Sequence, residues 1–126
     1  MPKLRFPWVW WAPGWLLVIG VCVGSLLPSR MLPDIFDFDD KLRHAGAYLL
    51  LMVWFGGIIG RDKYLMLAAA LVLLGFALDV LQLGVPSRTF SLSDVAANLV
   101  GIAVGLALLW FWLAGWCQRV ERHFFV

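Results

Sequence analysis

A small polar set interrupts a chain that is otherwise largely apolar, and its side chains are of the kinds that do chemistry. Carboxylates and an imidazole can transfer protons or orient other groups. Guanidinium and ammonium groups bind anions such as phosphate, and amides bind hydroxyl or ester oxygens. The set comprises Asp40, Lys41, His44, Asp79, Gln82, Arg88, Asp94 and Asn98. Ionisable groups in or beside a membrane are costly and usually face a bundle interior or a cavity.

The spacing of these residues places them on shared helix faces. Residues three or four apart lie on one face of an α-helix. The pairs with that spacing are Asp40 with His44, Asp79 with Gln82, and Asp94 with Asn98. Tyr48 continues the first face, and Gly101 and Gly105 continue the third as a GxxxG motif, which allows close helix contact. Three helices would thus bring the polar set to one level of the molecule.

The composition defines the elements that must position this set. Of the 126 residues, 63% are hydrophobic and 14% are charged, and the mean hydropathy is +0.88. A soluble domain of this size could not bury so much apolar surface, so we expect an integral membrane protein. A span needs about 20 largely apolar residues, and four runs qualify: 11–27, 42–59, 64–83 and 92–116. The sequence predicts an all-α membrane protein, with residues 1–126 forming one bundle of four transmembrane helices.

The distribution of Lys and Arg predicts the topology. Six of them lie at the termini and between the second and third spans, and four lie in the other two connections. Because basic residues accumulate on the cytoplasmic side, both termini are expected in the cytoplasm. Tryptophans cluster at the start of the first span and the end of the fourth, as in an aromatic belt at one interface. We expect a protein of the bacterial cytoplasmic membrane, with the polar set at the outer interface.

Several of the polar residues also have a purely structural interpretation. Asp94 could cap the fourth helix, Asp40 could complement the dipole of the second, and Asn98 could form an interhelical hydrogen bond. Asp79 is harder to explain in this way, because an Asp at the centre of a span costs about 2.5–3.5 kcal/mol on insertion scales. Asp79 therefore needs a partner, and Arg88 or His44 is expected to provide it.

Two stretches resemble a known family. They are DKLRHAGAYLLL at 40–51 and ALDVLQLGVPSRTFSLSDVAANLVGIAVG at 77–105. Their order and spacing are similar to those of the VanZ-like membrane proteins: D-K-x-x-H-x-x-x-Y, an acid three residues before Gln, P-x-R, and D-x-x-x-N-x-x-G-x-x-x-G. Asp79 stands where Glu is common in that family. The resemblance covers about half the chain and implies a cell-envelope role linked to resistance to the glycopeptide teicoplanin, without supplying a molecular activity.

Three hypotheses for function follow, the first being a site for an anionic lipid head group, either polyprenyl-phosphate-linked or phospholipid. Arg88 and Lys41 would hold the phosphate, and Asn98 and Gln82 would bind sugar or ester oxygens. The remaining members of the polar set would orient these groups or carry out chemistry; they are Asp40, His44, Asp79 and Asp94.

The second hypothesis is a hydrolase or transferase acting on such a lipid, with His44 as general acid/base and Asp79 or Asp40 as its orienting partner. The spacing does not indicate a metal site, although an acid–His–acid cluster could hold a divalent ion. The third hypothesis is a non-catalytic membrane subunit with a structural polar cluster, which binds a partner helix through Gly101 and Gly105. Nucleic-acid binding is not expected, because the basic residues are few and divided between two sides.

Overall fold

The structure, a computed structural model, describes residues 4, 6–26, 40–81, 84 and 92–124. Every regular element in these residues is helical, which confirms the predicted fold class at that level. The α-helices are α1 (Pro7–Leu26), α2 (Asp40–Ile58), α3 (Tyr64–Leu81), α4 (Leu92–Leu108) and α5 (Trp116–Phe124). A 3-10 turn, η2 (Arg61–Lys63), joins α2 to α3, and a π-helical turn, η4 (Leu109–Leu113), follows α4.

Three segments within the described residues are long and apolar enough to cross a membrane: Pro7–Gly24, Arg61–Leu81 and Val95–Leu113. They support the prediction of a membrane protein. The second predicted span, α2, is not among them. Its first turns carry Asp40, Lys41, Arg43 and His44, which lower its apolar character.

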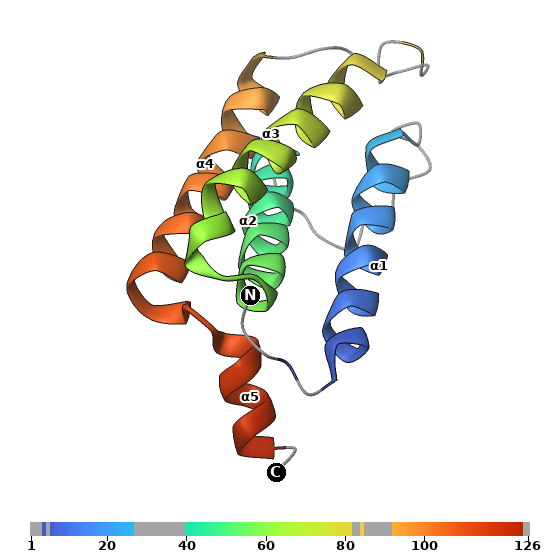
Figure 1. Cartoon of the computed structure of the whole chain (residues 1–126). Coiled ribbons are helices and arrows are strands. Elements are labelled where there is room, and N and C mark those ends of the chain that lie inside the picture. Colours follow the sequence, from blue (N-terminus) through green and yellow to red (C-terminus); the bar gives the residue numbers. More distant parts are fainter. Residues whose placement is uncertain (1–3, 5, 27–39, 82–83, 85–91, 125–126) are drawn as a thin grey trace.

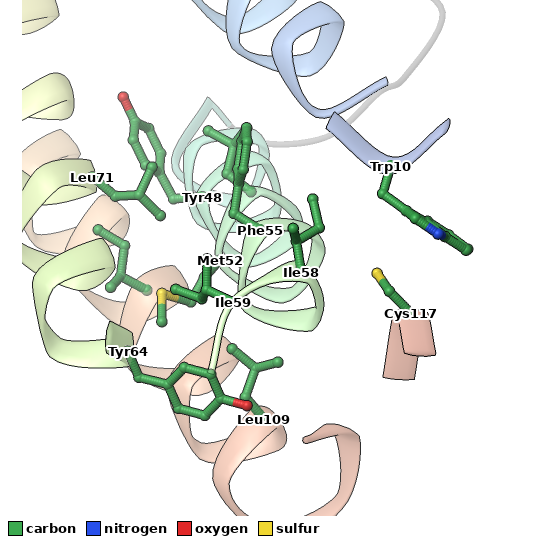
Figure 2. Packing of buried hydrophobic residues seen from close by; sticks show 12 residues of the cluster. Trp10, Tyr48, Met52, Phe55, Ile58, Ile59, Tyr64, Leu71, Leu109 and Cys117 are labelled. Carbon is green, nitrogen blue, oxygen red and sulfur yellow. The ribbon is translucent and has the colours of Figure 1, made fainter. Parts of the chain in front are cut away.

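The helix α2 occupies the middle of the molecule and packs against α1, α3, α4 and α5 (Figure 1). Its buried side chains form much of the core, with Tyr48 at one end of the cluster and Tyr64 and Leu109 towards the other (Figure 2). A helix surrounded by other helices needs little lipid-facing surface of its own. This position explains how α2 can be long and yet less apolar than its neighbours.

The most extensive helix interface joins α2 to α4, and two glycines permit it. A Cβ atom at Gly101 would overlap the backbone carbonyl of Ala45. One at Gly105 would lie 2.8 Å from Cβ of Met52 and 3.2 Å from the carbonyl oxygen of Leu49. The GxxxG face is therefore buried against α2 of the same chain.

The helix α1 begins earlier than the sequence predicts, at Pro7 rather than near residue 11, and contains Pro13. A proline inside a helix costs about 3 kcal/mol because it removes a hydrogen bond and crowds the preceding turn. Packing of the first turn of α1 offsets that cost, because Trp10 in this turn is buried and contacts both α2 and α5. Pro7 itself suits the first helical turn, where its missing N–H is not needed.

The fourth predicted span does not continue as one helix to Trp116. The α-helix ends at Leu108, η4 follows, and the chain then turns at Gly115, whose φ of 67° is in the left-handed region. Glycine adopts this conformation without steric cost. The turn allows the Trp116 indole to contact Gly57 and to donate to the carbonyl of Val53, at 2.7 Å.

The start of α1 and the helix α5 meet in what we call the tryptophan end. Trp10, Trp54 and Trp116 pack with ring centroids 5.3–5.8 Å apart. The Trp54 indole donates to the carbonyl of Trp10 at 2.8 Å. The carboxylate of Glu121 accepts both the Trp10 indole at 3.0 Å and the backbone N–H of Phe6 at 2.8 Å. The two tryptophan-rich segments of the sequence thus lie at the same end of the molecule (Figure 1).

Candidate functional site

The opposite end of the molecule, where α1 ends, α2 begins, α3 ends and α4 begins, holds the described members of the polar set (Figure 1). We call this group, His44, Tyr48, Asp79 and Asn98 with Gly75, the polar end. Asp79 and Asn98 are only 2% and 4% exposed, and His44 is partly buried. Buried polar groups of this kind need hydrogen-bond or charge partners, because solvent no longer supplies them.

The imidazole of His44 and the amide of Asn98 form the central contact. Nδ1 of His44 lies 3.0 Å from Oδ1 of Asn98, joining α2 to α4. An amide oxygen only accepts hydrogen bonds, so this pairing, as assigned, requires the proton on Nδ1. The unprotonated nitrogen of the neutral ring is then Nε2. His44 can use it to accept a proton or, when charged, to donate to an anion.

Gly75 on α3 leaves room for the other side of the Asn98 amide. A Cβ atom at this position would lie 2.9 Å from Nδ2 of Asn98 and 3.2 Å from the Tyr48 hydroxyl. Both polar groups therefore approach the same point on the α3 backbone. A larger residue there would push the amide or the phenol aside.

Asp79 lies one turn beyond Gly75 on the same face of α3. Its carboxylate interacts electrostatically with Tyr48, and so does the Cys22 side chain of α1. The polar end thus draws side chains from four helices. The spacing predicts His44, Asp79 and Asn98 at one level; the structure joins His44 to Asn98 and places Asp79 near Tyr48. The hydrogen-bond partner that the structure gives for His44 is Asn98.

The remaining predicted site residues stay predictions. Gln82 and Arg88 lie outside the described residues. Asp40, Lys41 and Asp94 belong to described helices, but their side chains lie outside what the structure describes. In the part of the chain that is described, no three His, Cys, Asp or Glu side chains are grouped so as to hold a metal ion.

Comparison with protein-family models, curated proteins and solved structures finds no match to this chain. The site is therefore defined by its own geometry.

Two contributors to this site are not evident from the amino-acid sequence. Gly75 is one of the 12 glycines of the chain and lies in an apolar helix, so only its four-residue spacing from Asp79 could have drawn attention to it. Cys22 lies in a helix that carries no other member of the site, so nothing in its local sequence links it to Tyr48. Both were identified from contacts between helices.

Proposed function

We propose that this protein binds an anionic lipid head group at its polar end, in the cytoplasmic membrane of a bacterium and on the outer side of that membrane. The observation that carries the proposal is the His44–Asn98 hydrogen bond beside the buried Asp79 carboxylate. A bundle that only packs apolar surfaces does not need such a costly set. The motif similarity to VanZ-like proteins, and with it a role in glycopeptide resistance, is part of this proposal.

The arrangement of the chain supports four spans with both termini on one side. The backbone N–H of Phe6 and the carboxylate of Glu121 are in contact, so the beginning of α1 and α5 share one end. A chain whose ends share one side crosses a membrane an even number of times. Three apolar spans alone would be an odd number of crossings, whereas α2 as a fourth span makes the number even. At 19 residues, α2 measures about 28 Å, close to the hydrocarbon thickness.

Each described residue has a defined task in this proposal. Nε2 of His44 contacts the head group, and Asn98 holds the ring in that orientation. The Tyr48 hydroxyl and the Asn98 amide can bind ester or sugar oxygens. Asp79 orients the basic partners of the phosphate, for which Arg88 and Lys41 remain the predicted residues.

Lipid analysis of the purified protein tests the proposal. After a high-salt wash, which weakens binding by exposed charges, we expect the wild-type protein to retain one anionic lipid class. His44→Ala and Asn98→Ala should retain at least about tenfold less of it, a loss of about 1.4 kcal/mol. The matched controls are His123→Ala and Gln118→Ala, which remove an imidazole and a side-chain amide from α5. These controls should retain the wild-type amount.

A melting temperature measured on the same samples separates a site from a scaffold. If the polar end only holds helices together, lipid retention per folded molecule stays constant while the melting temperature of Asn98→Ala falls. That result, or equal losses in the α5 controls, would contradict the proposal and favour a structural cluster.

A second candidate function is hydrolysis of a polyprenyl diphosphate or phospholipid, and the His44–Asn98 pair is the specific observation in its favour. With the Nδ1 proton donated to Asn98, Nε2 can accept the proton of a water molecule whose oxygen attacks the terminal phosphorus of a diphosphate. The bond from that phosphorus to the bridging oxygen breaks, and the prenyl monophosphate leaves. The protein should then release inorganic phosphate from farnesyl diphosphate, and His44→Gln should abolish that release. Absence of phosphate release by a protein that still binds the lipid would leave binding as the function.

A further inference from the structure

The junction between α4 and α5 exposes aromatic rings beside arginines. Trp110, Phe111 and Trp112 in η4 are 49%, 71% and 71% exposed. Amphipathic rings of this kind favour the boundary between hydrocarbon and head groups, where one face is apolar and the surroundings are wet. The apolar span that contains them ends at Leu113, so the next residues emerge at that boundary.

Two arginines bind the carbonyl groups of the π-helical turn. Arg61 donates to the carbonyl of Trp110 at 3.1 Å, and its guanidinium lies 5.2 Å from the centroid of the Trp110 ring. Arg119 donates to the carbonyl of Trp112 at 3.0 Å. Each of these contacts uses one N–H, whereas a guanidinium has five. Both groups are exposed and held beside the aromatic rings, with further donors for an external anion.

The outward charge of α5 is positive. Its one carboxylate, Glu121, is buried and accepts hydrogen bonds from Phe6 and Trp10. Arg119 and Arg122 remain exposed. The turn η2 contains two basic residues, Arg61 and Lys63, and one acidic residue, Asp62, so its net charge is also positive. With nine residues, α5 spans about 14 Å and is too short to cross the membrane.

We propose that Arg61, Arg119 and Arg122 bind the phosphate groups of anionic phospholipids at the membrane surface, with the rings of η4 set into the boundary below them. The occupant is a lipid surface because charge and apolar rings occur together, and because this face directly follows a span. Guanidinium groups pair with phosphate oxygens in a bidentate manner, and each basic residue near an anionic surface contributes about 1 kcal/mol. This surface is separate from the polar end.

Thermal unfolding of the full chain in detergent, with dioctanoyl phosphatidylglycerol or dioctanoyl phosphatidylcholine added, tests this proposal. A ligand that binds only the folded state raises the melting temperature. We expect phosphatidylglycerol to raise the melting temperature of the Asn98→Ala protein by about 3–6 °C more than phosphatidylcholine does. The Asn98→Ala background is used because this change is expected to weaken lipid binding at the polar end. High salt should reduce the difference, because ions screen exposed charges.

Replacing all three arginines by Gln should remove more than half of the difference between the melting-temperature increases that the two lipids produce. The matched control is Arg43→Gln, an exposed arginine near the start of α2 that removes a charge at the opposite end. If the triple variant does not fold, Arg122→Gln alone should reduce the difference by about a third. The proposal would be overturned if the triple variant kept the full lipid-dependent difference in melting temperature. It would also be overturned if Arg43→Gln reduced that difference as much, per charge removed, as the triple variant does.

Discussion

The two ends of the molecule both bury polar groups, but they satisfy them differently. At the tryptophan end, each of the three clustered indoles donates to a named acceptor, and Glu121 joins the first and last helices. At the polar end, His44 and Asn98 use one nitrogen and one oxygen on each other. The amide nitrogen of Asn98 and the Tyr48 hydroxyl both approach Gly75, and the Asp79 carboxylate interacts electrostatically with Tyr48. We infer that the tryptophan end stabilises the fold, and we propose that the polar end binds a ligand.

The largest expected effect comes from breaking the contact that supports both ends. In Gly101→Ala, the new Cβ would overlap the Ala45 backbone, which cannot move without separating α2 from α4. We expect a loss of about 3 kcal/mol in the free energy of unfolding, at the upper end of overpacking effects. Thermal unfolding in detergent measures it. In the matched control Gly46→Ala, a Cβ would meet nothing within 4 Å, so stability should stay equal or rise.

The second effect isolates the tryptophan end. Glu121→Ala leaves the Phe6 N–H and the Trp10 indole without their acceptor. Each donor left unsatisfied costs about 1–3 kcal/mol, so the melting temperature should fall clearly. Lipid retention per folded molecule at the polar end should not change. Glu121→Gln retains an acceptor oxygen, so its melting temperature should lie between those of the wild-type protein and Glu121→Ala. Loss of lipid retention in Glu121→Ala would mean that the two ends are coupled.

The third effect isolates the polar end. In Gly75→Ala, a Cβ would crowd the Asn98 amide and the Tyr48 hydroxyl, both of which are side-chain ends that can shift. Stability should change by about 1 kcal/mol or less, whereas lipid retention should fall at least severalfold. Gly20→Ala is the matched control, because a Cβ there would meet nothing within 4 Å. If Gly75→Ala melts far lower and retains its lipid, the polar end is a scaffold.

The smallest perturbation uses the two native thiols to compare the ends. Cys117 is fully buried, and burial, with the nearby Glu121 carboxylate as the lesser cause, raises its pKa to about 12. The reactive thiolate is then about one part in ten thousand at pH 8. Cys22 is partly exposed. In single-cysteine variants, N-ethylmaleimide should label Cys22 at least about tenfold faster. Adding Glu121→Ala should speed labelling of Cys117 and leave Cys22 unchanged.

The all-helical character could be predicted from the long apolar runs, and the helix faces that the polar residues share could be predicted from their spacing. Helical spacing places His44 and Tyr48 on one face, and the GxxxG spacing in α4 marks a contact surface. The partner of that surface, α2, could not be derived, because spacing identifies a face but not what covers it. The same limit applies to His44, whose amide partner lies 54 residues away in sequence.

The tryptophan end shows a second limit. Trp10 and Trp116 have the positions expected of an interfacial belt, yet their rings pack on each other, with Trp10 buried and Trp116 partly buried. Their burial depends on the turn at Gly115 and on the carboxylate of Glu121, which together return α5 to the start of α1. A continuous apolar run through residue 116 conceals that turn. Hydropathy reports the length of a span and carries no information on tertiary hydrogen bonds.

The most direct test of a lipid site at the polar end is nitrogen NMR of the protein labelled in its two histidine rings. His44 reports on the polar end, and His123, which is exposed in α5, reports on the opposite end. The contact with Oδ1 of Asn98 requires a proton on Nδ1 of His44 and leaves Nε2 to report on a ligand. Adding farnesyl phosphate or dioctanoyl phosphatidylglycerol should shift the His44 signals, chiefly Nε2, and the more effective of the two identifies the lipid class. Signals from His44 that do not move at saturating lipid, or shifts confined to His123, would contradict a head-group site at the polar end.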